Sequence, residues 1–402
     1  MRTLAWPLEP DEIEAVFKAM RFAHCKWDIY HRGKHNLMPD AIVLSRSEHE
    51  LLTETAGRVW KSLRQLENQV IESPEALAGV GIPEALRPAI TGNKPKAPRL
   101  SRCDFHLTVG GRWMISEFNE DGPGGFSEAH GLNAVLSGEW GPRFDGLEFP
   151  GGIREHLIAA FDPWPRIGLV YATAYSEDLQ QITLIADWLR AAGHLAVCGS
   201  PANLVMDGDA ASLFDEPVDA LFRYFPGEWL GDLPNAGDWL QAIQSVPMIN
   251  SLNALVSQSK RFYAAANEHD LDLAAHDREV IAHHLPESRY LEPGLREQLI
   301  VEREDWVLKG AFGRMGDTVR LGIGCSPQEW ADTLDRALGQ SDLYAVQQRF
   351  DTVPMWFSSG LAYASVGVYL IDGQFAGYYS RVSSYPVINY DSCHVATLVE
   401  TA

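Results

Sequence analysis

The sequence predicts a mixed α/β fold of the α+β kind, and three observations predict it. Residues 166–225 alternate apolar strand patterns with an amphipathic helix pattern, which is typical of parallel strands joined by a helix. Residues 101–121 have the alternation and the glycine turn of a hairpin, and most of the chain after residue 305 also has strand patterns. Residues 9–90, by contrast, show the apolar spacing of helices.

The N-terminal region, residues 1–95, is predicted to be helical. Apolar residues recur at intervals of three and four in residues 10–29 and again in residues 45–73. The second segment begins with Ser45 or Ser47 followed by Glu48 or Glu50, a pattern typical of a capped helix start. The proline-containing, polar stretch ITGNKPKAPRL then predicts a connector.

Three further regions follow the connector. Residues 96–160 are predicted to contain the hairpin, which turns at Gly110-Gly111, and a glycine loop that opens a short helix. Residues 161–255 predict a Rossmann-like α/β subdomain, although no GxGxxG follows its first strand. This absence disfavours a nucleotide-cofactor oxidoreductase and favours a structural or substrate-side role. Residues 256–402 predict alternating strands with one helix between the first two.

Composition and charge exclude some classes of partner. The chain has 402 residues, 46% hydrophobic and 22% charged, which is ordinary for a globular protein. A net charge of −21 argues against binding nucleic acid or an anionic membrane. No apolar run has membrane-spanning length, and the N-terminus lacks the apolar core of a signal peptide. Five separated cysteines without a CxxC pair predict reduced thiols and a cytoplasmic protein.

The predicted hairpin brings together five polar residues whose types suit a metal site. Residues at alternate positions of a strand share one face, so we expect several of these side chains to lie close together. Charges on a packed face need partners, and a cation is one candidate. A surface network of salt bridges is the alternative. The residues are Arg102, Asp104, Glu117, Asn119 and Asp121.

Three basic residues later in the chain are candidates for binding an anion. Lys309 ends an apolar strand pattern and precedes a loop with Gly313, Arg314 and Gly316, whose glycines would let the backbone approach phosphate oxygens. The loop lacks the order of a Walker motif. Lys260 precedes an apolar helix pattern and Arg381 ends a strand pattern. Each basic residue taken alone is more typical of a protein surface.

The order of these motifs along the chain resembles that of a known family. R-x-D is followed by E-x-N-x-D, a glutamate before alanine, a lysine, K-x-x-x-G-R-x-G, Q-x-F and a late S-R. This order resembles the glutathionylspermidine synthase family of ATP-grasp carboxylate–amine ligases, in its synthetase part, over residues 95–400. The resemblance implies an ATP-grasp fold, with the Rossmann-like segment as the pre-ATP-grasp subdomain.

The resemblance also implies roles for individual residues. Asp104, Glu117 and Asn119 match magnesium ligands, while Arg102 and Arg381 match arginines that act at the transferred phosphate. The residues that match the ATP site are Lys260, Lys309, Gly313, Arg314, Gly316, Gln347, Gln348 and Phe350. Glu128 matches a glutamate that ends the glycine loop, for which we expect a structural or substrate-side role.

The implied activity joins a small carboxylate to an amine, with ATP and Mg²⁺, through an acyl phosphate. The helical N-terminal region has no counterpart of the amidase domain that bifunctional members carry. Gly310 stands where a proline is usual, and GPGG replaces a threonine–proline type of turn, so glutathione and spermidine are not assigned as substrates. The alternative is a non-catalytic or regulatory ATP-grasp protein that binds nucleotide. The sequence predicts no oligomeric state.

Overall fold

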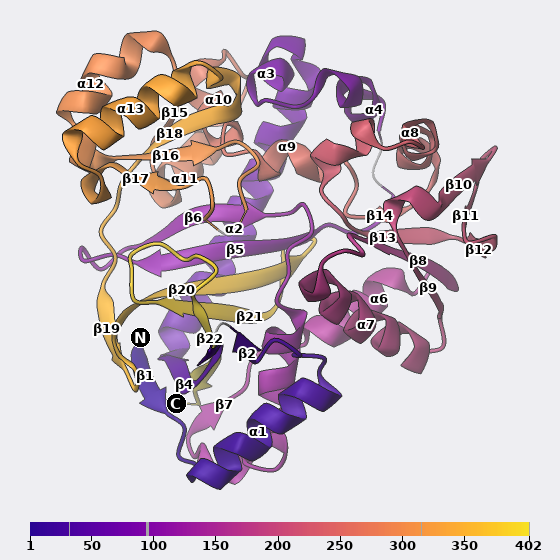
Figure 1. Cartoon of the computed structure of the whole chain (residues 1–402), viewed down its shortest axis with the longest axis vertical. Coiled ribbons are helices and arrows are strands. Elements are labelled where there is room, and N and C mark those ends of the chain that lie inside the picture. Colours follow the sequence, from indigo (N-terminus) through magenta and orange to yellow (C-terminus); the bar gives the residue numbers. More distant parts are fainter. Residues whose placement is uncertain (32, 94–95, 315, 402) are drawn as a thin grey trace.

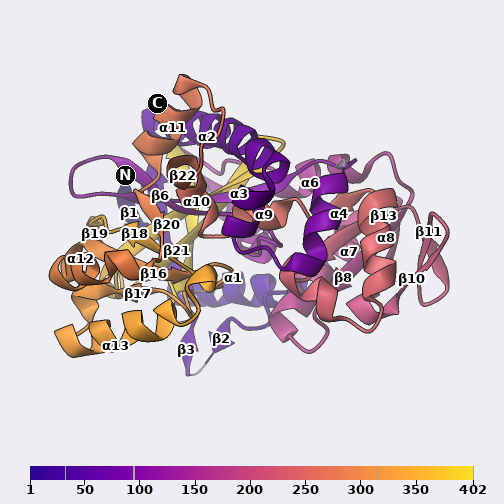
Figure 2. The same ribbon diagram turned by 90° about the horizontal axis from the view of Figure 1, so that it is seen from above.

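The computed structural model shows a single chain with three main sheets and two smaller ones among its described residues (Figure 1). The structure describes residues 1–31, 33–93, 96–314 and 316–401. A small antiparallel sheet and a parallel α/β unit lie at opposite sides of a large central sheet, as both views show (Figure 2). Among the described helices, none has the length and apolar character needed to cross a membrane.

The central sheet draws strands from both ends of the chain. Its main path runs β1-β4-β22-β21-β20-β5-β6, with β19 paired to β20 and β7 paired to β22. All its pairs are antiparallel except β22 with β4. The strands are β1 (Arg2–Ala5), β4 (Leu37–Leu44), β5 (Leu100–Leu107), β6 (Trp113–Asn119), β7 (Leu147–Glu148), β19 (Pro354–Phe357), β20 (Gly360–Ile371), β21 (Gln374–Ser383) and β22 (Cys393–Glu400).

The N-terminal region contains the predicted helices and also four strands that the sequence did not predict, of which β2 (Tyr30–His31) and β3 (Lys34–His35) pair with each other outside the central sheet. The helices are α1 (Pro10–Ala23), α2 (Arg46–Glu72), α3 (Pro74–Gly79) and α4 (Arg87–Gly92). The entirely helical interpretation of residues 1–95 is wrong because β1 and β4 join the central sheet. A short apolar run such as LMPDAIVL suits either a strand or a helix, and its tertiary neighbours decide between them. Residues 94–95, in the predicted connector, lie outside the described residues.

Helix α2 covers one face of the central sheet. Its start is capped by Ser45, whose side chain accepts from the Glu48 backbone while the Glu48 side chain accepts from the Ser45 backbone. The buried side chains Leu52, Val59 and Leu63 recur at helical spacing and join a core that includes residues of β5 and β20. This apolar stripe covers one face of the central sheet, and the candidate site described below lies on the opposite face.

The parallel α/β unit follows the central hairpin in the sequence. Its sheet has the order β14-β13-β8-β9 with all pairs parallel, as the strand–helix–strand pattern predicts. Three short antiparallel strands form a separate small sheet beside it. The elements are α6 (Ile153–Phe161), β8 (Arg166–Tyr171), α7 (Ser176–Ala191), β9 (Leu195–Gly199), β10 (Leu204–Asp207), β11 (Ala210–Leu213), β12 (Glu216–Val218), β13 (Ala220–Tyr224), α8 (Ala236–Ser245) and β14 (Met248–Ile249).

The small antiparallel sheet has the order β15-β18-β16-β17 and packs against α12 and α13. Trp330 and Leu334 of α13 are fully buried against Leu308 and Val346 of the sheet. The elements of this part of the chain are α9 (Ala254–Gln258), α10 (Phe262–Glu268), α11 (Ala275–His284), β15 (Ser288–Tyr290), α12 (Arg296–Val301), β16 (Trp306–Gly310), β17 (Arg320–Leu321), α13 (Pro327–Leu338) and β18 (Tyr344–Gln348).

The predicted hairpin is present as β5 and β6, and it contains a bulge. Asp104 lies opposite Glu117, but Phe105 lies opposite Ile115, so Ser116 is an extra residue in β6. A bulge lets two consecutive side chains reach the same side of a sheet, which a regular strand does not allow. After the hairpin, the predicted glycine loop leads into a π-helical turn at Ser127–Leu132 and then α5 (Asn133–Gly138).

Candidate active site

A cleft lies between the central sheet and the small antiparallel sheet. The space between its walls is about 890 Å³ with open solvent included. The central sheet and its loops contribute Asp104, His106, Ser116, Glu117, Thr352, Ser365, Arg381, Pro386, Val387 and Ile388. The opposite wall contains Lys260, Val307, Lys309, Gly310, Gly313, Gly316, Thr318, Val319, Leu321, Gln347, Gln348, Arg349 and Phe350.

The two carboxylates of the cleft are on neighbouring strands. Asp104 of β5 lies opposite Glu117 of β6, and the bulge turns both Ser116 and Glu117 to the cleft. Asn119 lies beside them, where its Nδ2 donates to Asp104 Oδ2 at 3.1 Å and to Glu117 Oε1 at 3.4 Å. The hairpin therefore gathers three oxygen-bearing side chains, of which Asp104 and Glu117 line the cleft and Asn119 does not.

Two arginines hold Asp104, which is only 1% exposed. Arg102 Nε donates to its Oδ1 at 2.8 Å, and Arg381 Nη2 donates to its Oδ2 at 2.8 Å. Arg102 does not line the cleft but lies behind Asp104 and over the Tyr379 ring, with 4.7 Å from its Cζ to the ring centroid. Because these pairs are buried, they are not the surface salt-bridge network that we considered as an alternative.

Lys260 and Glu117 bring two distant parts of the chain into contact. Lys260 lies between α9 and α10, and its Nζ is 2.9 Å from Glu117 Oε2. Burial alone would raise the pKa of Glu117, but the charges of Lys260, Lys309 and Arg381 outweigh it and hold this pKa well below its usual value. Glu117 is therefore ionised at neutral pH.

Lys309 reaches the same point from the end of β16. Its Nζ donates to the Ser116 carbonyl oxygen at 3.0 Å, and it makes no ion pair with any residue that the structure describes. Burial lowers the pKa of Lys309 to about 8, with Lys260 adding to this effect and Glu117 opposing it. An anion bound beside Lys309 would supply the countercharge that its ammonium group lacks.

The far end of the cleft is less charged. Gln347 and Gln348 at the end of β18 line it together with Phe350, and Gln347 Nε2 donates to Ser288 Oγ at 3.1 Å. The Phe350 ring lies 5.7 Å from that of His106, measured between centroids. Apolar side chains such as Val307 and Leu321 complete this wall, so this end suits a flat, partly apolar group.

The glycine loop after β16 contacts the cleft, but its arginine points elsewhere. Gly313 and Gly316 line the cleft, and Gly316 has a φ of +69° with the Ile388 carbonyl where a side chain would be. Arg314 instead pairs with Glu228, and its Nη2 lies 3.0 Å from Asp121 Oδ2. The structure thus does not place Arg314 at the cleft lining. Residue 315 of the predicted loop lies outside the described residues.

Asp121 and Glu128, which the sequence singled out with the hairpin, make structural ion pairs. Asp121 Oδ1 accepts from Arg223 Nη1 at 2.5 Å, and neither side chain is exposed. Glu128 Oε1 lies 2.7 Å from Lys26 Nζ, and this pair links the π-helical turn to the segment after α1. Both carboxylates lie outside the residues that line the cleft.

Comparison with family models identifies the chain. The model of the family described as "Glutathionylspermidine synthase preATP-grasp" matches residues 12–400. The chain belongs to this family. Membership supports a synthetase-like ligase that acts on small molecules, and it agrees with the order of motifs in the sequence.

One of two similar solved structures supports the fold of this family member. A glutathione synthetase-like effector (GSS30) from Globodera pallida, in its apo form, is 11% identical with a TM-score of 0.58, and the match covers 97% of each chain. A proposed gamma-glutamylcysteine synthetase from Methylobacillus flagellatus KT is 14% identical with a TM-score of 0.45, covering 83% of this chain and 82% of that one. The first likeness shows a shared fold. A search of curated proteins gave no match.

The donor chemistry at the hairpin fits Mg²⁺. Two carboxylates and an amide are the hard oxygen ligands that Mg²⁺ takes from proteins, and phosphates and water complete its coordination. No cluster of three or more His, Cys, Asp or Glu side chains arranged for a metal occurs in the part of the chain that the structure describes.

The site also contains residues that sequence reasoning missed. His106 lines the cleft, and burial lowers its pKa to about 4, so it is neutral at pH 7. Gly367 of β20 lies opposite Asp104, where a Cβ atom would be 3.0 Å from both Arg102 Cδ and Asp104 Oδ1. A glycine in an alternating strand signals such a close approach, but the sequence does not say to what.

Proposed function

We propose that the protein is an ATP- and Mg²⁺-dependent ligase that forms an amide bond between a small carboxylate and an amine, producing ADP. The observation that carries this proposal is the contact between Glu117 and Lys260, in a cleft that Asp104, Lys309 and Arg381 also line. The two carboxylates could bind a metal ion, and the three cations Lys260, Lys309 and Arg381 could bind the phosphates attached to it.

The proposed reaction has two steps. An oxygen of the substrate carboxylate attacks the γ-phosphorus of ATP, the bond from phosphorus to the β–γ bridging oxygen breaks, and ADP leaves. The amine then attacks the acyl carbon, loses a proton to solvent, and expels inorganic phosphate that carries one original carboxylate oxygen. Bound Mg²⁺ would supply charge neutralisation at the phosphates.

The chain's own residues would bind and orient the reacting groups. Lys260 and Lys309 would hold phosphate oxygens, and Arg381 would face the transferred group, with Arg102 fixing Asp104 from behind. Asp104, Glu117 and Asn119 would hold the metal. Gln347, Gln348 and Phe350 would contact the adenine, and the loop with Gly313 and Gly316 would limit the access of water to the acyl phosphate.

The regions of the chain would divide this work. Residues 96–160 and 256–402 would supply the metal and nucleotide sites, while residues 161–255 would lie on the substrate side. The free thiols of the five cysteines fit a cytoplasmic location, where ATP is available. The substrates would be small molecules, and the net charge of −21 gives no support to a nucleic-acid partner.

The test is ADP release on mixing the protein with ATP, Mg²⁺ and a panel of amino acids, short peptides and amines. A productive pair should yield ADP, phosphate and an amide in equal amounts, measured by coupled assay and mass spectrometry. With ¹⁸O in the substrate carboxylate, one label should appear in the phosphate. Nucleotide binding without ADP release for any pair would instead support the non-catalytic, nucleotide-binding alternative.

A further inference from the structure

Gln258, the last residue of α9, contacts both sides of the candidate metal–phosphate site. Its side-chain Oε1 accepts from the backbone N–H groups of Glu120 at 2.8 Å and Asp121 at 3.0 Å, just after the end of β6. Its backbone carbonyl accepts from Lys260 Nζ at 3.4 Å. One buried residue therefore connects the strand that carries Glu117 with the lysine that pairs with Glu117.

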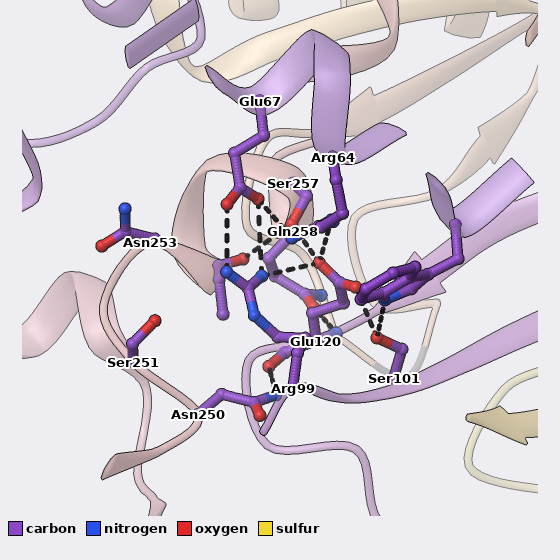
Figure 3. Close-up of polar contacts among 12 residues, drawn as sticks. Arg64, Glu67, Arg99, Ser101, Glu120, Asn250, Ser251, Asn253, Ser257 and Gln258 are labelled. Carbon is purple, nitrogen blue, oxygen red and sulfur yellow. Dashed lines mark hydrogen bonds and ion pairs between the residues drawn. The ribbon is translucent and has the colours of Figure 1, made fainter. Parts of the chain in front are cut away.

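A buried cluster of charged and polar side chains lies next to Gln258 and contacts the residues that Gln258 joins (Figure 3). We call it the Glu120 cluster. Its members are Arg64, Glu67, Arg99, Ser101, Glu120 and Ser257. The Glu120 carboxylate accepts from Arg64 at 2.6 Å and from Arg99 at 3.0 Å, and it also accepts from Ser257, the residue before Gln258.

The charges of the Glu120 cluster balance. Two arginines face two glutamates, and Glu120 is 0% exposed. Burial would raise the pKa of Glu120, but the charges of Arg64 and Arg99 and the hydrogen bonds from Ser101 and Ser257 hold it below its usual value. Such a buried network restricts the arrangement of its members, although Arg64 Nε has no hydrogen-bond partner among the described residues.

A second tie joins the same two segments. The Phe118 backbone N–H donates to the Tyr263 hydroxyl at 2.9 Å, and Tyr263 lies in α10, three residues after Lys260. Three backbone N–H groups just after Glu117, those of residues 118, 120 and 121, therefore donate to side chains of the segment that carries Lys260. Glu117 and Lys260 are the side chains of these two segments that line the cleft.

We infer that Gln258 is a positioning residue, which sets Lys260 at its distance from Glu117 and so fixes the metal side of the site relative to the phosphate side. This inference rests on the proposed function. Gln258 does not line the cleft, so it acts through Lys260 and the end of β6. Replacing the groups that orient metal ligands typically lowers metal affinity or activity about 10- to 100-fold, and we expect an effect of this order through Lys260.

Glu67 offers a matched control within the same cluster. It pairs with Arg99 at 3.0 Å and with Arg64 at 2.6 Å, and neither of these contacts involves the segment from Ser257 to Lys260. The substitution Glu67→Gln removes a buried charge and should destabilise the fold more than the substitution Gln258→Met. If the cluster had only a structural role, Glu67→Gln would therefore lower both the urea midpoint and the affinity for the nucleotide more than Gln258→Met does.

The experiment compares the dissociation constant of a non-hydrolysable ATP analogue with Mg²⁺ in wild type, Gln258→Met, Tyr263→Phe and Glu67→Gln, by calorimetry, alongside urea unfolding. Gln258→Met should weaken binding about 10-fold or more, and Tyr263→Phe by a smaller factor, while Glu67→Gln lowers the urea midpoint and leaves binding unchanged.

The other outcomes distinguish the positioning role of Gln258 from the proposed function of the protein. Equal dissociation constants in wild type and Gln258→Met, or in wild type and Tyr263→Phe if Gln258→Met does not fold, would overturn the positioning role but not the proposed function. A parallel loss of affinity and stability across all variants, Glu67→Gln included, would also overturn it. Failure of the wild type to bind the analogue would overturn the proposed function and this inference with it.

Discussion

Replacing Gly367 by alanine tests the geometry around Asp104 directly. Gly367 lies in β20 opposite Asp104, and it pairs with Tyr379 of β21 on its other side. A Cβ atom at this position would be 2.5 Å from the Tyr379 carbonyl oxygen and 3.0 Å from both Arg102 Cδ and Asp104 Oδ1. The carbonyl belongs to the backbone of a paired strand in the middle of the sheet, so β20 must shift to relieve this contact, and the shift disturbs the packing of the same position against Arg102 and Asp104.

The expected cost has two parts. Overpacking of a buried site costs about 1–3 kcal/mol of unfolding free energy, which urea denaturation measures. Displacement of Asp104 from its two arginines should reduce ADP release about 10- to 100-fold and raise the Mg²⁺ concentration needed for half-maximal rate. The assay is a Mg²⁺ titration of ADP release at saturating ATP with a productive substrate pair.

Gly110 provides the matched control. It lies in the turn of the same hairpin, where a Cβ atom would meet only Thr108 Oγ1 at 3.8 Å. Gly110→Ala should therefore change stability by no more than about 0.5 kcal/mol and leave the Mg²⁺ titration unchanged. If Gly367→Ala has the same turnover and the same Mg²⁺ dependence as Gly110→Ala, the reasoning about Asp104 is refuted.

Three further predictions concern the charged groups. Asp104→Ala and Glu117→Ala should each abolish ADP release while circular dichroism shows a retained fold; wild-type turnover in either would remove that residue from the metal site. Lys309→Met should weaken ATP binding about 10- to 100-fold by calorimetry, the cost of a lost charge-assisted hydrogen bond, and unchanged affinity would contradict its role. Burial lowers the pKa of Lys309 to about 8, so wild-type affinity for ATP should fall as pH rises through this value and Lys309 loses its proton. In Lys309→Met this pH dependence should be absent; its persistence would assign it to another group.

The same pKa shift has a consequence for stability. Between pH 8 and the ordinary pKa of 10.5, the unfolded chain holds a proton on Lys309 that the folded chain has released. The contribution of Lys309 to the unfolding free energy therefore rises with pH across this interval. Lys309 destabilises the ligand-free fold below pH 8, where its buried ammonium group is charged.

Local patterns were sufficient to predict the hairpin and the shared face of Arg102 and Asp104. Strand alternation puts Arg102 and Asp104 on one face, and the Gly110-Gly111 turn brings β6 back beside β5. The order of motifs predicted the family and the fold, which the family comparison confirmed. The parallel strands between residues 166 and 224 also follow from their alternation with a helix.

Features that depend on distant partners could not be predicted in this way. The bulge at Ser116 depends on pairing between two strands, and no single-strand pattern marks it. Strand β4 was missed because an eight-residue apolar run is ambiguous until β22 lies beside it. Arg314 has glycine neighbours typical of a phosphate loop, yet Asp121 and Glu228, far from it in the sequence, take its guanidinium group.

The central claim is that the hairpin carboxylates and two distant lysines surround one metal–triphosphate group. The most direct measurement is a crystal structure of the protein with Mg²⁺ and a non-hydrolysable ATP analogue. The account predicts a metal about 2.1 Å from oxygens of Asp104 and Glu117, with Lys260 and Lys309 on the phosphates. A nucleotide bound elsewhere, or a triphosphate without contact to these four side chains, would contradict it.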